Sequence, residues 1–256
     1  MTEVDGSRVA RVVIERLARA GCVAADEEAE DLVRWAPDQP TLMSWVSRRE
    51  QGEPIAWIVG TVGFCGHEVR VDQGVFVPRA QSSELARRGA ELLGARGRAA
   101  DLCTGSGAVA VHLAVSRPGA AVVATDLDPR AVACARRNGV AAVVADADLG
   151  LCGGAFDVVT AVPPYVPTDA LRLLPADVTR YEPRVALDGG RDGLDLVRRL
   201  AAGAARLLRP GGWLVTEIGG DQDTATAQIL AEGGFGEPAF WRDAEGDLRG
   251  AAARRR

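Results

Sequence analysis

The residues that point most directly to chemistry lie in one short segment, residues 156–167. Apolar residues 156–161 predict a strand, and Pro163 and Pro164 end it, because proline has no N–H to donate and a fixed φ angle. We expect backbone carbonyls here that no neighbouring strand uses, followed by the aromatic ring of Tyr165. In an open α/β sheet, ligands bind beyond the carboxyl ends of the strands. The segment therefore predicts one wall of a reaction pocket.

A glycine-containing turn follows an earlier apolar strand and opens a helix. Residues 101–107 read DLCTGSG. Glycines allow the backbone to turn tightly and approach a ligand closely, and the helix N-terminus offers free N–H groups. Many strand–helix turns contain one Gly-x-Gly, and this spacing also fits a dinucleotide site. The turn alone is therefore weak evidence for a ligand site and does not identify the ligand.

Aspartates follow the next two predicted strands. Asp126 stands at the end of the second strand, where a carboxylate can accept hydrogen bonds from ribose hydroxyl groups. Asp128 is better placed to cap the helix that begins at Pro129, so Asp126 has no evident structural duty. After the third strand, either Asp146 or Asp148 could receive the exocyclic amine of an adenine, and we slightly prefer Asp148.

Together, the turn and the carboxylates specify a ligand that contains adenosine, either a nicotinamide cofactor or S-adenosylmethionine. The Pro-Pro-Tyr segment favours S-adenosylmethionine. The lone pair of an amide or guanidinium nitrogen is delocalised, so methylation of such a nitrogen needs carbonyls that hold its N–H groups and favour charge build-up. An adjacent aromatic ring can stack on the planar group and tolerate its transient positive charge. A hydride transferase needs neither feature.

Composition excludes several other classes of protein. The net charge of −5 argues against a dedicated nucleic-acid binder, which usually carries a basic surface. The five cysteines are scattered and the chain has two histidines, so we expect no disulfide framework and no metal site, and we expect a cytoplasmic protein. No apolar run is long enough to span a bilayer, so no membrane role is expected.

Three regions must position these residues. Residues 1–60 predict a helical bundle for substrate recognition. In residues 61–78, valines alternate around residues 72–74, whose sequence Asp-Gln-Gly has turn chemistry, and this predicts a linking β-hairpin. Residues 79–256 predict the S-adenosylmethionine-binding domain.

This third region begins with a helix and then alternates strands with helices. The alternation predicts a mostly parallel sheet that is covered on both faces. Residues 236–253 are more typical of a closing antiparallel hairpin, and the last three arginines of a solvated tail. The expected strands are 99–103, 121–125, 142–145, 156–161 and 212–217, and the expected helices are 83–93, 108–116, 129–138, 194–208 and 224–232.

In combination, these features resemble the HemK-type protein-(glutamine-N5) methyltransferases, which modify peptide chain release factors. The resemblance covers nearly the whole chain and implies a seven-stranded Rossmann-like class I methyltransferase domain (α/β) with a small N-terminal helical domain and a linking β-hairpin. It also implies direct methyl transfer from S-adenosyl-L-methionine without a metal. The segments that carry it are 52–60, 64–66, 75–79, 101–107, 182–195, 210–212 and 217–222.

The resemblance further implies roles for individual residues. Phe64, Arg79 and Tyr165 would line the acceptor pocket. The catalytic segment would be Val162, Pro163, Pro164 and Tyr165, with the Pro163 carbonyl accepting an N–H from the target nitrogen. The cofactor would be held by Asp101, Thr104, Gly105, Ser106, Gly107, Asp126, Leu127 and either Asp146 or Asp148.

Two positions depart from the family pattern. The reactive motif of the family is Asn-Pro-Pro-Tyr, and Val162 replaces the Asn that normally hydrogen-bonds the glutamine amide. Loss of one such hydrogen-bonding group lowers the stabilisation of the transition state by about 2.7–4 kcal/mol, which slows the reaction on the order of 10²–10³-fold. After Pro78 and Arg79, the family continues Pro-Glu-Thr-Glu, whereas this chain has Ala-Gln-Ser-Ser-Glu, so no role is assigned to Glu84.

The leading hypothesis is an S-adenosylmethionine-dependent N-methyltransferase that acts on a release-factor glutamine. Because of Val162, the alternative acceptor is a small molecule, such as an amino acid or a guanidino metabolite. An NAD-dependent oxidoreductase fits only the turn and Asp126. A non-catalytic relative that binds the cofactor is a further alternative.

Overall fold

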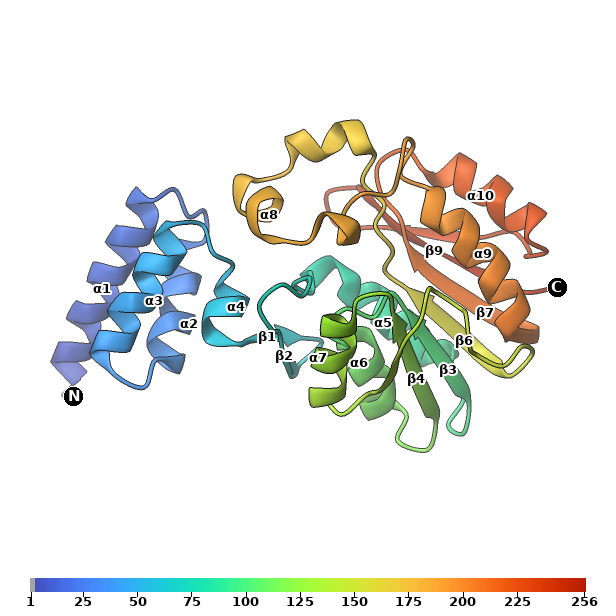
Figure 1. The fold of residues 1–256 in the computed structure, drawn as a ribbon, viewed down its shortest axis with the longest axis horizontal. Helices are drawn as coiled ribbons and strands as arrows, with labels where there is room; N and C mark the ends of the chain where they lie inside the picture. The colour runs from blue at the N-terminus through green and yellow to red at the C-terminus, as the bar shows by residue number, and fades with distance from the viewer. Residues whose placement is uncertain (1–2) are drawn as a thin grey trace.

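The computed structural model describes residues 3–256, with the side chains of residues 8–175 and 177–256. A small helical body at the N-terminus is joined by a hairpin to a larger α/β body (Figure 1). In the part of the chain that is described, no helix is long and apolar enough to cross a membrane.

The helical body has its own hydrophobic core. Leu17, Leu32 and Val46 come from three successive helices and are fully buried together. Asp38 caps the third helix by accepting a hydrogen bond from the Thr41 N–H at 2.8 Å. Residues 1–2 of the predicted domain lie outside the described residues. The helices are α1 (Glu3–Arg19), α2 (Ala25–Trp35), α3 (Gln39–Glu50) and the short α4 (Ile55–Val59), which the sequence did not predict.

The linking hairpin differs from the predicted one. Strands β1 (Thr61–Phe64) and β2 (His67–Arg70) pair antiparallel through a two-residue turn, with Cys65 at φ 49° and Gly66 at φ 78°. A turn does lie at residues 72–75, where the Val75 N–H donates to the Asp72 carbonyl at 3.0 Å, but it does not join paired strands, so the predicted position of the hairpin was wrong. The valines around it are buried by packing rather than by strand pairing: Val71 and Val77 lie against Trp57, and Val75 lies against Ala131 and Cys134.

The larger body contains one seven-stranded sheet with the order β5-β4-β3-β6-β7-β9-β8. Strands β3 to β7 are parallel, and β9 runs antiparallel between β7 and β8. This confirms the predicted Rossmann-like α/β class, including the closing hairpin. The strands are β3 (Arg98–Leu102), β4 (Ala121–Asp126), β5 (Ala141–Val144), β6 (Phe156–Ala161), β7 (Leu208–Glu217), β8 (Ala239–Arg242) and β9 (Leu248–Arg254).

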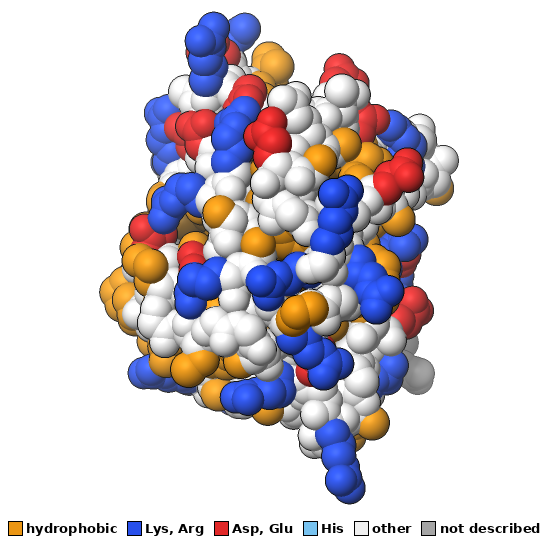
Figure 2. All heavy atoms as spheres, turned by 90° about the vertical axis from the view of Figure 1, so that its right-hand side faces the viewer, with side chains coloured by type: hydrophobic (Ala, Val, Ile, Leu, Met, Phe, Trp, Pro, Cys, Tyr) orange, Lys and Arg blue, Asp and Glu red, His pale blue; other side chains and the backbone are white. Residues whose placement is uncertain are grey.

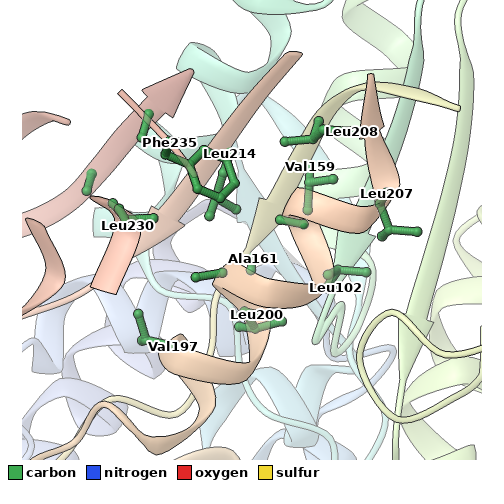
Figure 3. Close-up of a cluster of buried hydrophobic side chains, with 14 of the residues drawn as sticks. Leu102, Val159, Ala161, Val197, Leu200, Leu207, Leu208, Leu214, Leu230 and Phe235 are labelled. Atoms are coloured by element: carbon green, nitrogen blue, oxygen red, sulfur yellow. The ribbon is translucent and has the colours of Figure 1, made fainter. Parts of the chain in front are cut away.

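Helices cover both faces of the sheet. On one face, Leu200 and Leu207 of α9 pack with Val159 of β6 and Leu214 of β7 (Figure 3). On the other, Leu85 and Leu113 of α5 and α6 form a second core. The strand order reverses beside β3, which opens a ligand crevice at the carboxyl ends of the strands. The helices are α5 (Ser83–Leu92), α6 (Ala108–Ser116), α7 (Pro129–Arg137), α9 (Asp195–Leu207) and α10 (Asp223–Glu232).

The segment between β6 and α9 contains elements that the sequence did not predict. It bridges the two bodies, because the Tyr181 hydroxyl donates to the Gln51 carbonyl at 3.0 Å and the Tyr181 ring meets Trp57 edge-on at 6.4 Å. Arg49 also lies 3.7 Å from the carboxylate of Asp177. These elements are η2 (Thr168–Leu173), α8 (Ala176–Tyr181) and η3 (Arg184–Ala186).

The last three arginines do not form a solvated tail, contrary to prediction. Arg254 is the last residue of β9 and pairs with Trp213, and the Arg255 N–H donates to the Gly212 carbonyl at 2.8 Å. The side chains of Arg254 and Arg256 are exposed, whereas Arg255 is half-buried and its guanidinium donates to the Leu208 carbonyl. Figure 2 faces this side of the molecule, where basic side chains are frequent on the surface.

Candidate active site

A cavity of about 980 Å³ opens at the carboxyl ends of the parallel strands. Its floor comes from the ends of β3, β4 and β6, and its walls come from Phe64 of β1, from η1 (Ala80–Ser82) and from residues 183–190. The cavity therefore joins segments from the linker, the sheet and the bridging segment. It lies where the switch in strand order predicts a ligand.

The first part of the cofactor turn is held by a buried carboxylate. Asp101 is 1% exposed and lines the cavity. Its two oxygens accept hydrogen bonds from the hydroxyls of Thr104 at 2.6 Å and Thr160 at 2.7 Å. Burial raises the pKa of Asp101 to about 6, against the lowering effect of these hydrogen bonds. The carboxylate can therefore offer a negative charge to a cationic ligand near neutral pH.

The two glycines of the turn have different duties. Gly105 lines the cavity at φ 57°, and a Cβ there would meet nothing within 4 Å, so its face is open to a ligand. Gly107 does not line the cavity. Its φ is 86°, and a Cβ there would lie 3.0 Å from Ala135, so it lets α6 begin close to α7. Ser106 also lines the cavity.

Asp126 holds the turn from the neighbouring strand. Its carboxylate lines the cavity and accepts from the N–H groups of Gly105 at 2.8 Å and Asp128 at 2.9 Å. Burial raises its pKa. Asp128 caps α7 as expected, by accepting from the Arg130 N–H at 2.8 Å. The neighbouring Leu127 lines the cavity and is 59% exposed, which leaves an apolar surface for a flat ring.

The structure separates the two aspartates that follow the third strand. Asp146 lines the cavity and forms an ion pair with Arg199 of α9 at 2.7 Å. Asp148, our preferred residue, does not line the cavity. It pairs with Arg206 at 2.7 Å and lies against Gly203. The geometry therefore brings Asp146 to the place where the adenine contact was expected.

One end of the cavity, called the acceptor end because the sequence predicts the acceptor there, is lined by apolar side chains. Val162, Pro164 and the buried Phe64 line it, and Val162 packs against the core cluster that contains Phe64. Pro163 lies between two lining residues but is not part of the lining. Where the family carries an amide side chain, this chain therefore presents two methyl groups.

Two residues predicted in the acceptor pocket lie behind its walls. The Tyr165 ring packs on Gly219, and its hydroxyl donates to Glu217 at 2.8 Å and accepts from Gln81 at 2.9 Å. Burial and the adjacent carboxylate raise the pKa of Tyr165. Arg79 stacks over the Phe76 ring at 4.9 Å and forms an ion pair with the buried Glu182.

Several site residues were not predicted from the sequence. Ser82, Asp188 and Arg199 line the cavity, and Glu217 lies behind it. Glu217 ends an apolar strand at the same edge as the cofactor turn, and this position was a usable signal. No comparable signal marks Ser82 or Asp188. Among the described residues, no group of three or more His, Cys, Asp or Glu side chains is arranged to hold a metal.

The site has the parts expected of one class of protein. A Rossmann-like sheet, a glycine turn with open space at Gly105, and carboxylates at the ends of β3 and β4 fit an adenosine cofactor that carries a positive charge. Strand β6, the other neighbour of β3, is followed by Pro163 and Pro164, which favour methyl transfer over hydride transfer. These features define a class I methyltransferase that uses S-adenosylmethionine.

Known proteins lead to the same class. Residues 70–173 match the family model named Methyltransferase small domain. The release factor glutamine methyltransferase of Moorella thermoacetica is 40% identical over 84% of this chain and 86% of its own, and that of Xylella fastidiosa (strain 9a5c) is 39% identical over 78% and 76%. A T. thermophilus 16S rRNA methyltransferase, solved with AdoMet and guanosine, shares the fold with a TM-score of 0.52 at 20% identity, over 76% of this chain and 44% of its own.

The chain belongs to the release factor glutamine methyltransferase family. It is an S-adenosylmethionine-dependent N-methyltransferase, as the sequence predicted. The alternative of an NAD-dependent oxidoreductase is therefore rejected.

Proposed function

We propose that this enzyme methylates the side-chain amide nitrogen of a glutamine in a peptide chain release factor. The observation that carries the proposal is the family membership, since relatives that match most of this chain are named for that substrate. A cavity that is open to the surface and lined by the linker, the sheet and the bridging segment is suited to a side chain presented by another protein.

We propose that the cofactor lies along the ends of β3, β4 and β5. Bound S-adenosylmethionine supplies a methyl group on a positively charged sulfur. Asp101 and the open backbone at Gly105 would hold its methionine part, and Thr104 would act by orienting Asp101. Ser106 would also contact the cofactor. Asp126 would bind the ribose, and Leu127 and Asp146 would contact the adenine.

We propose that the target nitrogen enters between Phe64 and Pro164. The Pro163 carbonyl would accept one of its N–H groups, which is supported by its position between two lining residues. A carbonyl that is fixed in place before binding stabilises the charge that develops on nitrogen without reorganising. Val162 supplies no such group, so the backbone carries this function in the present enzyme.

The helical body is proposed to recognise the protein substrate. The proposed division is residues 1–60 for recognition, 61–78 for the linker and 79–256 for catalysis. The bridging contacts of Tyr181 with Gln51 and Trp57 support it, because they tie the helical body to a segment that lines the cavity.

Val162 favours a second candidate, a small-molecule nitrogen acceptor such as an amino acid or a guanidino metabolite. An apolar wall leaves the carbonyl oxygen of a glutamine amide without a side-chain donor at this position, which costs roughly 1–3 kcal/mol when the oxygen is buried. An acceptor without that oxygen avoids the cost.

Methyl transfer from labelled S-adenosylmethionine tests the proposal. We expect label on purified release factor, mapped by mass spectrometry to one glutamine and absent when that glutamine is replaced by alanine. Label that appears only in the small-molecule fraction of a cell extract would assign the second candidate instead.

A further inference from the structure

We infer that Glu217 is a positioning residue for methyl transfer, because its carboxylate joins the two walls of the acceptor end. The inference depends on the methyltransferase activity and not on the identity of the acceptor. Glu217 is the last residue of β7 and is 2% exposed.

Three donors converge on this buried carboxylate. Oε1 accepts from the Tyr165 hydroxyl at 2.8 Å and from Gln81 Nε2 at 3.2 Å, while Oε2 accepts from Ser82 Oγ at 2.5 Å. Within the part of the chain that the structure describes, Glu217 forms no ion pair. Burial of a charge without a cation is costly unless its hydrogen bonds are satisfied, so the three donors are what keep this carboxylate in place.

The partners of Glu217 belong to opposite walls of the cavity. Tyr165 directly follows Pro164, which lines one wall, and Ser82 itself lines the other. Gln81 also donates to the Tyr165 hydroxyl at 2.9 Å, so Gln81, Tyr165 and Glu217 form a closed ring of hydrogen bonds. A change at Glu217 therefore alters the separation of the walls between which the target nitrogen must fit.

Among the described residues, the side chain of Glu217 forms no hydrogen bond with a residue of the cofactor end. Asp101 and Asp126 hold the cofactor turn through Thr104, Thr160 and Gly105. Loss of the Glu217 charge should consequently reduce turnover while cofactor binding is preserved. A residue that merely stabilised the fold would affect both in parallel.

A second anchor should keep the enzyme folded without Glu217. Gln222 Nε2 donates to the Tyr165 carbonyl at 2.9 Å and to the Asp192 carbonyl at 3.1 Å, and Gln222 Oε1 accepts from the Gly219 N–H at 3.0 Å. The backbone of the Pro-Pro-Tyr segment thus stays attached when only the side-chain ring is disturbed.

Glu217→Gln tests the inference with an isosteric change. We expect kcat to fall on the order of 10–100-fold, since a small misplacement of reacting groups costs up to about 10²-fold. The Kd for S-adenosylmethionine, measured by calorimetry, should stay within about twofold. Glu84→Gln, the same change at a half-exposed glutamate on α5 that pairs only with Arg87 and Arg88 of its own helix among the described residues, is the matched control and should leave kcat unchanged.

A charge exchange distinguishes positioning from general stability. The double variant Gln81→Glu with Glu217→Gln returns one carboxylate to the ring beside the Tyr165 hydroxyl. We expect it to recover a substantial part of the lost kcat. Full kcat in Glu217→Gln, a parallel loss of cofactor binding, or a double variant no better than the single one would overturn the inference.

Tyr165→Phe is the test if Glu217→Gln does not fold. It removes only the hydroxyl that donates to Glu217, and the ring keeps its packing on Gly219. A several-fold fall in kcat with unchanged cofactor Kd supports the inference, and unchanged kcat overturns it.

Discussion

The two ends of the cavity are built in different ways. At the cofactor end, the hydrogen bonds that shape the turn span few positions, 3 between Thr104 and Asp101 and 21 between Gly105 and Asp126, while one further bond joins Asp101 to Thr160, 59 positions away. At the acceptor end, the Tyr165–Glu217 bond spans 52 positions and the Ser82–Glu217 bond spans 135.

Because of this difference, we expect substitutions at the two ends to affect different properties of the enzyme. The cofactor end is one strand–turn–helix unit that is held by the two neighbouring strands β4 and β6, so a change there should weaken cofactor binding. The acceptor end is assembled only when the linker, β6, the bridging segment and β7 have packed together. A change there should lower turnover and leave the cofactor in place.

Gly193→Ala should break the acceptor end most strongly. Gly193 has φ 77°, and an added Cβ would lie 2.2 Å from the Tyr165 carbonyl oxygen and 2.4 Å from Gln222 Nε2. Because the close atom is backbone, the Pro-Pro-Tyr segment must move, and we expect turnover to fall on the order of 10²–10³-fold. Cofactor Kd, measured by calorimetry, should change less than about threefold.

The control for this variant is Gly220→Ala. Gly220 also has positive φ, at 54°, but a Cβ there would meet nothing within 4 Å. The Gly220→Ala variant has the backbone strain of a positive φ angle but no steric clash of the new Cβ, so it should keep most of its activity. An equal loss in both variants would show that strain alone is responsible and would remove the distinction between the two ends.

Asp126→Ala should give the opposite pattern at the cofactor end. The change leaves the Gly105 N–H without its acceptor and removes the proposed ribose contact. Hydrogen bonds to a charged group contribute about 1.5–3 kcal/mol, so we expect cofactor Kd to rise about 10–150-fold. Asp148→Ala is the matched control, because Asp148 pairs with Arg206 away from the cavity, and its Kd should stay within about threefold.

The same difference explains what the sequence could predict. The strands, the cofactor turn and Asp126 follow from apolar periodicity and turn chemistry, which act over a few residues. The hairpin turn was misplaced because Val71 and Val75 are buried against helices that the local pattern does not contain. Tyr165 was expected to face the ligand, but Glu217 and Gln81 hold its ring behind the wall.

Short helices within the bridging segment escaped prediction for a related reason. Residues 168–186 have no sustained period, and their shape depends on contacts such as those of Tyr181 with the helical body and of Glu182 with Arg79. Such contacts are set by packing and not by local propensity. The choice between Asp146 and Asp148 could not be made from local sequence for the same reason. Asp148 is held away from the cavity by its ion pair with Arg206.

Val162→Asn should improve catalysis at the acceptor end rather than impair it. The new amide would restore a hydrogen-bonding group beside the target nitrogen, and we expect kcat toward a release-factor glutamine to rise on the order of tenfold. Val162→Thr has a similar volume without the amide and should give no such gain. Methyl transfer from labelled cofactor measures both. No gain in the Asn variant would mean that the backbone already supplies the full stabilisation.

A pH titration gives the smallest expected effect and returns to the cofactor end. Because the pKa of Asp101 is raised to about 6, its negative charge is lost as pH falls through that value. A cationic cofactor should therefore bind about three- to fourfold more weakly at about pH 5.5 than at pH 7 if the charge at Asp101 attracts it. Asp101→Asn should remove this dependence in calorimetric titrations.

Protonation of Asp101 should raise the free energy of unfolding while it lowers the affinity for the cofactor. The unfolded state has an Asp pKa near about 3.9, so between about pH 6 and pH 4 the folded state binds more protons and its free energy of unfolding rises as pH falls. The contribution of this buried group amounts to about 2 kcal/mol over that window. Urea denaturation of the parent and Asp101→Asn at the two pH values isolates it. If affinity and stability instead fall together on acidification, the loss of binding reflects general acid unfolding, and Asp101 is not the group that attracts the cofactor.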